Sequence, residues 1–268
     1  MVGPFPPFEP HGGGGPRIRE IPLRLIVPNL ITVLAICAGL SGIRLAFEGR
    51  VETAVVMVLL AAFLDAVDGR VARMLKASSR FGAQMDSLAD IVNFGVAPVL
   101  VLYAYLLDQA GAIGWIAALL FTIACALRLA RFNVMLDDND RPAWQTDYFV
   151  GVPAPAGAAL VMLPVYLGFL GISPEGPVAI AACIYTLGIA FLLISRLPVY
   201  SGKSSGSRVR REFVMPLMLV VVLYALLLAS FTWETMAVSA ILYLVFLVFS
   251  MRAYQRRAAR EEAEDDVE

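Results

Sequence analysis

The stretch DAVDGRVARMLKASSRFGAQMDSLAD (residues 65–90) connects two long apolar segments, at residues 51–75 and 82–107. Residues three or four apart lie on one face of a helix. Asp65 and Asp68 therefore project together from the first segment, and Asp86 and Asp90 project together from the second. A short basic turn between the segments lets the two helices lie side by side. The stretch predicts an adjacent helix pair that gathers four carboxylates.

The composition places this pair in a membrane. Of the 268 residues, 59% are hydrophobic and only 16% are charged, whereas soluble domains carry about 25% charged residues. Backbone groups in lipid must bond internally, so long apolar segments are helices. We expect an all-α polytopic membrane protein with about eight transmembrane helices of about 20 residues each. They are predicted at 26–47, 51–75, 82–107, 112–135, 150–171, 177–196, 213–232 and 235–253.

The basic residues predict the orientation of the chain. All of the 21 Lys and Arg residues except Arg44 and Arg50 fall in the terminal segments or at alternate connections. Basic loops remain on the cytoplasmic side. We therefore expect a multi-pass protein of the cell (inner) membrane, with both termini in the cytoplasm and the acidic residues facing the cytoplasm.

Other common chemistries find little support. The single histidine, His11, lies in a Gly/Pro-rich tail, so a serine–histidine hydrolase lacks its base. Cys37, Cys125 and Cys183 lie in separate apolar segments without metal-ligand spacing. The GKSS at residues 202–205 lacks the rest of a phosphate-binding loop. We expect no nucleic-acid partner.

The four carboxylates favour a metal site. They cannot all stay ionised at this depth without compensation. Oxygen ligands without His or Cys indicate Mg²⁺ or Mn²⁺, and two metal ions about 4 Å apart are usual for displacement at phosphorus. The alternative is that the aspartates only form ion pairs with Arg70, Arg73 and Arg80.

The residues between the acids suit a nucleotide diphosphate. Gly69 and Gly82 remove side chains where a nucleotide would approach the backbone. Arg73 would hold a diphosphate through two parallel hydrogen bonds. The turn therefore combines a binding site for phosphate with the predicted metal site.

Eight positions of this stretch match the signature of the CDP-alcohol phosphotransferase family, which the chain resembles: Asp65, Asp68, Gly69, Ala72, Arg73, Gly82, Asp86 and Asp90. The resemblance implies a six-helix catalytic core, a homodimer and a site with two divalent cations that opens to the cytoplasm. It implies that Asp65, Asp68 and Asp86 bind metal, and that Asp90 is a metal contact and the general base. Gly69, Ala72 and Arg73 would line the CDP site, and Gly82 would give it room.

Further segments are similar to the phosphatidylserine synthase members of that family. They are PNLIT (28–32), DSLADIVNFGVAP (86–98), LRLARFN (127–133) and FVGVPAP (149–155). The resemblance covers about residues 22–212 and implies transfer of the phosphatidyl group of CDP-diacylglycerol to L-serine, with release of CMP. Together with the Pro/Gly-rich start and the charged end of the chain, it suggests a division into a disordered tail (1–20), a catalytic core (21–212), two additional helices (213–253) and a charged tail (254–268).

Two groups of residues would bind the substrates. Arg128 and Arg131 lie three apart on one helix face and would hold the serine carboxylate in a planar fork, with Asn133 beside the amino group or the fork. The alternative is that both arginines are cytoplasmic anchors. Asn29 and Thr32 would bond the nucleotide, or they would cap the start of a helix.

Four other functions remain open from the sequence. Glycerol 3-phosphate or inositol phosphate as acceptor would need a more basic cavity, and choline would need aromatic or acidic neighbours. A cation transporter would also place acids within the membrane.

Overall fold

A computed structural model gives the structure of the chain and describes residues 23–75, 79–136, 148–195, 197–200 and 211–265. The tail expected at residues 1–20 lies outside them. Six helices of the described residues are long and apolar enough to cross a membrane. This confirms the prediction of an all-α polytopic membrane protein, with six such spans where about eight were predicted: the helices predicted at 51–75 and 150–171 are not among the six.

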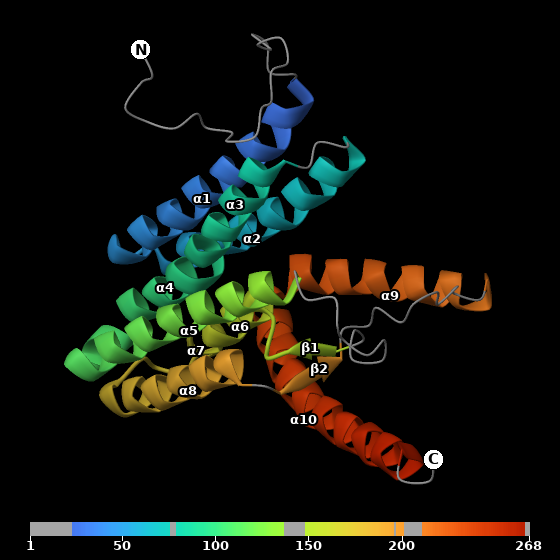
Figure 1. Ribbon diagram of the computed structural model, residues 1–268. Coiled ribbons are helices and arrows are strands. Elements are labelled where there is room, and N and C mark those ends of the chain that lie inside the picture. The colour runs from blue at the N-terminus through green and yellow to red at the C-terminus, as the bar shows by residue number, and fades with distance from the viewer. Residues whose placement is uncertain (1–22, 76–78, 137–147, 196, 201–210, 266–268) are drawn as a thin grey trace, which may run out of the picture.

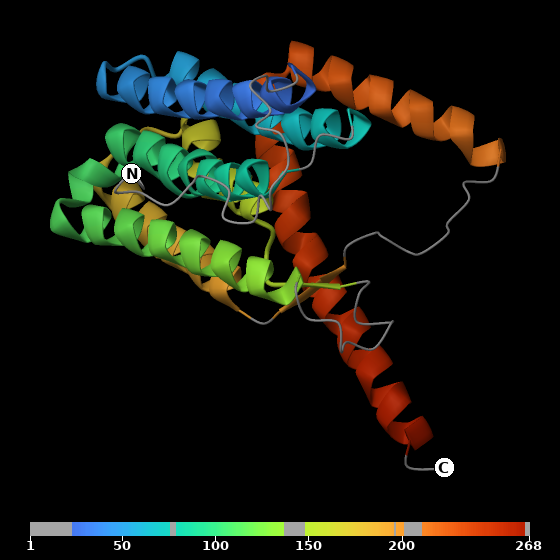
Figure 2. The same cartoon turned by 45° about the horizontal axis from the view of Figure 1, so that its top comes forward.

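The helices form two neighbouring groups, from which the last two helices extend away (Figures 1 and 2). In chain order the elements are α1 (Leu23–Phe47), α2 (Val51–Met74), α3 (Arg80–Asp90), the π-helix η1 (Ile91–Val96), α4 (Ala97–Tyr105), the 3₁₀-helix η2 (Leu107–Ala110), α5 (Ala112–Leu136), β1 (Tyr148–Val150), α6 (Ala154–Val161), α7 (Leu163–Phe169), α8 (Gly176–Ile194), β2 (Pro198–Tyr200), α9 (Arg211–Ser230) and α10 (Thr232–Asp265). The helices α1 and α2 lie along each other, and α5 packs against α8. The segment α3–η1–α4 lies between these two pairs.

The third predicted helix contains a π-helical segment that the sequence analysis missed. The span Phe81–Tyr105 is continuous, but its hydrogen bonds shift at η1, where the Ala97 amide donates to the Val92 carbonyl. Pro98 explains the shift, because proline cannot donate to the carbonyl four residues earlier. Thr122 of α5 donates to the carbonyl of Gly95, within the shifted segment, over 3.0 Å.

The fifth predicted helix, at residues 150–171, is divided into α6 and α7 at Met162. Pro164 stands near the start of α7, where a missing N–H is tolerated. The carbonyl four residues before it belongs to Leu160, and the Tyr185 hydroxyl donates to that carbonyl over 2.8 Å. Pro164 of α7 interrupts the helical hydrogen bonds, and Tyr185 of α8 satisfies the carbonyl four residues before that proline.

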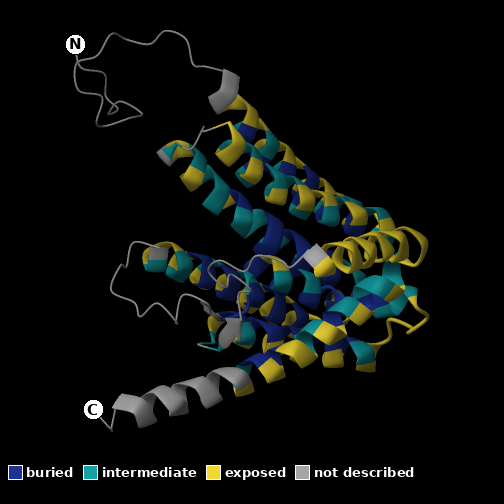
Figure 3. Ribbon diagram, turned by 90° about the vertical axis from the view of Figure 1, so that its right-hand side faces the viewer, coloured by how far each residue is buried: buried dark blue, intermediate teal, exposed yellow. Residues whose placement is uncertain are grey.

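The surface is mostly apolar, as a lipid environment requires. The tightly packed core includes Leu102, Phe121 and Tyr166, all fully buried. Figure 3 shows α9 exposed along its length, and its most apolar window has no buried residue. The short strands β1 and β2 pair in antiparallel fashion, with Tyr148 opposite Tyr200. The sequence pattern did not predict this strand pair.

Candidate active site

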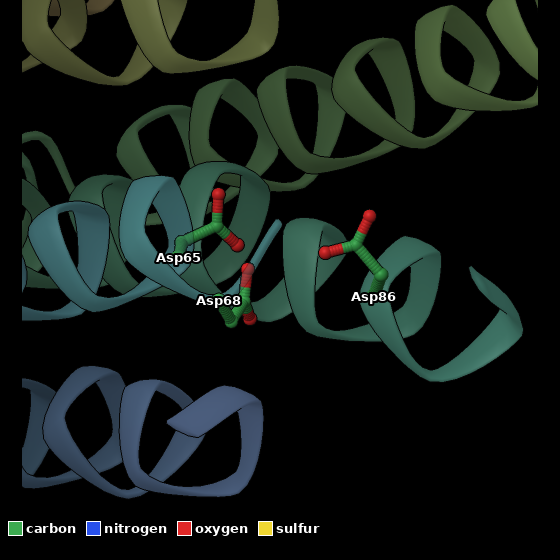
Figure 4. A group of neighbouring side chains, drawn as sticks. All are labelled: Asp65, Asp68 and Asp86. Atoms are coloured by element: carbon green, nitrogen blue, oxygen red, sulfur yellow. The ribbon is translucent and has the colours of Figure 1, made fainter. Parts of the chain in front are cut away.

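The acidic cluster is formed by side chains from α2 and α3. Figure 4 shows Asp65 and Asp68 on α2, with Asp86 of α3 turned toward them. One carboxylate oxygen from each residue lies within 4.8 Å of the other two. Asp90, one turn after Asp86, is within electrostatic range of Asp65, Asp68 and Asp86. The predicted gathering of four acids is therefore present.

The cluster fits a hard divalent cation. Asp65 Oδ1 and Asp68 Oδ1 are buried and have no hydrogen-bond partner among the described residues. Buried polar atoms are usually paired, and an orphan pair of carboxylate oxygens indicates a missing partner. In the described part of the chain, no ion pair joins these carboxylates to Arg70 or Arg73. The alternative that ion pairing alone explains the acids is not supported there.

Thr32 of α1 completes the environment of Asp68. Its hydroxyl donates to Asp68 Oδ2 over 2.6 Å and also lies 3.1 Å from the carbonyl oxygen of Pro28. Thr32 is 4% exposed and Asp68 is 3% exposed. Because α1 is already helical at Leu23, neither Asn29 nor Thr32 caps the helix start, and that alternative is wrong.

A first cavity of about 190 Å³ lies between α1, α2 and α3. All six residues that the sequence analysis predicted for the CDP-lipid site line it: Asn29, Thr32, Gly69, Ala72, Arg73 and Gly82. Its wall also contains Ser79, which caps α3 by accepting a hydrogen bond from the Gly82 amide at 3.0 Å. A Ser three residues before the glycine was the available sequence signal for this cap.

A second cavity of about 320 Å³ is lined by residues of α2, α3, α5 and α6. The two cavities share four lining residues: Asp68, Gly69, Arg73 and Asp86. The residues that line the second cavity and not the first include Asp65, Asp90, Arg128, Phe132 and Pro155. The carboxylates thus stand where two cavities meet.

Arg128 is the cationic residue that α5 contributes to this second cavity. It is 7% exposed, its Nε donates to the Val152 carbonyl over 2.9 Å, and its guanidinium carbon lies 5.5 Å from the centre of the Phe132 ring. It is within electrostatic range of Asp90. A buried guanidinium held at one edge retains further donors for an anionic ligand.

The other two residues predicted for the acceptor lie elsewhere. Arg131 donates to carbonyl oxygens at the end of α8 and does not line either cavity. The Asn133 amide donates to Ser87 Oγ at 3.1 Å, again outside both linings. The structure therefore brings only Arg128 of the three into the site.

The structure is that of a polytopic membrane protein with an acidic centre where two cavities meet. The chain belongs to the CDP-alcohol phosphatidyltransferase family, whose model matches residues 25–194. A second model, CDP-alcohol phosphatidyltransferase 2, matches residues 212–247. The matched range 25–194 contains every residue that lines the two cavities.

Several curated relatives are similar over most of the chain. A CDP-diacylglycerol–serine O-phosphatidyltransferase of Mycobacterium leprae (strain TN) is 41% identical over 94% of this chain and 83% of its own length. The enzyme of the same name from Mycobacterium tuberculosis (strain ATCC 25618 / H37Rv) is 38% identical over 94% and 87%. That of Bacillus subtilis (strain 168) is 34% identical over 64% and 88%.

Proposed function

We propose that this enzyme transfers the phosphatidyl group of CDP-diacylglycerol to the hydroxyl of L-serine, giving phosphatidylserine and CMP. One observation carries the proposal: the carboxylates stand where a cavity lined by the residues predicted for the CDP site meets a cavity that contains Arg128. In-line displacement places the leaving CMP and the attacking hydroxyl on opposite sides of the reacting phosphorus, and two cavities that meet at the acids suit that arrangement. The names of the three relatives support serine as the acceptor.

The first cavity would hold the nucleotide and diphosphate of the donor lipid. Arg73 stands where both cavities meet, so its guanidinium would bind the diphosphate oxygens in a bidentate manner. Gly69 has nothing within 4 Å of where a Cβ would be, which leaves its face of the cavity open for the ligand. Asn29 and Thr32 would contact the cytidine from α1.

Asp65, Asp68, Asp86 and Asp90 would hold two divalent cations, Mg²⁺ or Mn²⁺. When bound, these cations would supply charge neutralisation for the diphosphate and the leaving group. The two orphan carboxylate oxygens support this assignment. Thr32 orients Asp68 through its hydrogen bond and so fixes one ligand from behind.

The second cavity would hold serine, with the Arg128 guanidinium on its carboxylate. Asp90 would accept the proton of the serine hydroxyl. The serine oxygen then forms a bond to the lipid-side phosphorus, the bond from that phosphorus to the bridging diphosphate oxygen breaks, and CMP carries away that oxygen. Fixed positions of both substrates would supply much of the rate.

The placement in the cell is part of the same proposal. The distribution of Lys and Arg supports the inner membrane, with both termini and the active site on the cytoplasmic side. Residues 21–212 would form the catalytic core, and α9 and α10 would be additional membrane helices. The homodimer stays a prediction from the family resemblance.

The direct test is an acceptor panel. Purified protein is given CDP-diacylglycerol and Mg²⁺ or Mn²⁺, with serine, glycerol 3-phosphate, inositol phosphate or choline in separate reactions, and CMP is measured. Of the four acceptors, we expect only serine to give CMP, and we expect no CMP after EDTA treatment. CMP with a different alcohol would retain the chemistry and overturn serine as the acceptor.

A further inference from the structure

Arg131 fastens the end of α5 to the end of α8. Its Nη1 donates to the Ile194 carbonyl over 2.8 Å, and its Nη2 lies 3.3 Å from the Leu193 carbonyl oxygen and 3.2 Å from that of Ser195. The last carbonyls of a helix have no partner within the helix. A guanidinium at this end satisfies them and complements the negative end of the helix dipole.

Gly151 lies against the same group of atoms. A Cβ at this position would meet Leu193 O at 2.8 Å, Ser195 O at 2.9 Å and Arg131 Nη2 at 2.9 Å. Its φ of +79° also favours glycine. Only a residue without a side chain allows the chain to pass this close to the contact between Arg131 and α8.

The segment after Gly151 leads directly into the second cavity. The Gly151 amide donates to the Leu197 carbonyl over 2.8 Å, and the Val152 carbonyl accepts the hydrogen bond from Arg128. Two and three residues after Val152, Ala154 and Pro155 line the cavity. The contact between Arg131 and α8 therefore fixes one wall of this cavity and the backbone atom that orients Arg128.

We propose that Arg131 is a positioning residue for the acceptor site, which it shapes through Gly151 and the Val152 carbonyl without touching the acceptor. The proposal rests on the proposed function, because it takes the second cavity as the acceptor site. It replaces the sequence-based prediction that Arg131 itself binds the serine carboxylate. Arg128 then remains as the arginine that faces the ligand.

The test compares two variants from different elements. Arg131→Lys keeps the charge but loses the planar set of donors, and Gly151→Ala disturbs the same contact with no change to Arg131. We expect both to raise the KM for serine by on the order of tenfold to a hundredfold. The KM for CDP-diacylglycerol should stay within about twofold, because the first cavity contains neither residue. Arg44→Lys and Gly176→Ala, at an exposed arginine and at a glycine with open space around it, are the matched controls.

Hydrogen–deuterium exchange at residues 192–197 and 148–153 supplies a readout that is independent of activity. Both variants should speed exchange there. If Arg131→Lys raises the serine KM while Gly151→Ala leaves both KM values and the exchange unchanged, Arg131 contacts the acceptor and the proposal is wrong. Unchanged kinetics in both variants would also overturn it. If the wild type uses a different alcohol, the same comparison is made with that alcohol, so a wrong acceptor and a wrong role for Arg131 remain distinguishable.

Discussion

The hydroxyl of Thr32 donates a hydrogen bond to Asp68 Oδ2 over 2.6 Å, from α1 to α2, and both side chains are buried. This bond links the helix that carries Asn29 to the acidic cluster. It leaves Asp68 Oδ1 without a partner among the described residues. One oxygen of Asp68 is thus oriented by the protein and the other is available to a cation.

Thr32→Val should lower activity with little change in fold, because valine has nearly the same shape and lacks the hydroxyl. Loss of a partner that orients a metal ligand typically costs 10- to 100-fold in metal affinity or activity. We expect the Mn²⁺ concentration for half-maximal rate to rise, and Thr32→Ser to keep most of the wild-type activity. Equal metal dependence in the valine variant and the wild type would contradict this role.

Asp86→Asn should abolish most activity and most metal binding. The amide keeps the shape but removes a charged ligand, and metal ions contribute several kcal/mol of charge stabilisation. That range corresponds to a rate loss of about 10²- to 10⁴-fold. Titration with Mn²⁺ followed by electron paramagnetic resonance measures binding without turnover. Asp108→Asn, at an exposed aspartate of η2, is the control and should behave as the wild type.

Gly69→Ala should weaken the binding of the donor lipid. Gly69 lines both cavities, and in the described part of the chain no neighbouring atom lies within 4 Å of the place where a Cβ would be. The added methyl group would therefore occupy part of the space proposed for the ligand and leave the packing intact. We expect a raised KM for CDP-diacylglycerol and an unchanged melting temperature. Gly188→Ala adds the same methyl to an open helical position outside both linings. A normal KM in the Gly69 variant would show that the nucleotide lies elsewhere.

Asn93→Leu should stabilise the protein. Asn93 lies in η1, is 0% exposed, and both polar atoms of its amide lack a partner among the described residues. A buried unsatisfied polar group costs about 1–3 kcal/mol, and an apolar side chain of similar shape removes that cost. We expect a higher melting temperature in detergent. A lower one would show that the amide has a partner, such as a buried water molecule.

The helix period explains why much of the site could be predicted from the sequence. Spacings of three and four residues placed Asp65 with Asp68 and Asp86 with Asp90, and the structure confirms both pairs. The six residues predicted for the CDP-lipid site also line one cavity. Local spacing fixes which residues share a helix face, so a motif that spans two adjacent helices is readable.

Features that depend on distant parts of the chain could not be predicted in this way. Arg131 has the same spacing from Arg128 as a ligand pair would have, but its partners lie more than 60 positions further along the chain. Both Pro98 and Pro164 can be seen in the sequence, but their effects differ. Pro98 shifts the hydrogen bonds of a continuous helix, whereas Pro164 divides a predicted helix into α6 and α7. Membrane helices tolerate proline where neighbouring side chains satisfy the freed carbonyls, and those neighbours are set by packing.

In the proposed mechanism, the serine hydroxyl attacks the lipid-side phosphorus at the acidic cluster. The most direct test supplies CDP-diacylglycerol and serine labelled with ¹⁸O in its hydroxyl, to the wild type and to Asp86→Asn, and analyses both products by mass spectrometry. We predict that the wild type places the label in phosphatidylserine, with an equal amount of unlabelled CMP, and that Asp86→Asn forms both products at least about 100-fold more slowly. Label in a cytidylyl-serine product with release of phosphatidic acid, or labelled lipid formed at the wild-type rate by Asp86→Asn, would contradict the account.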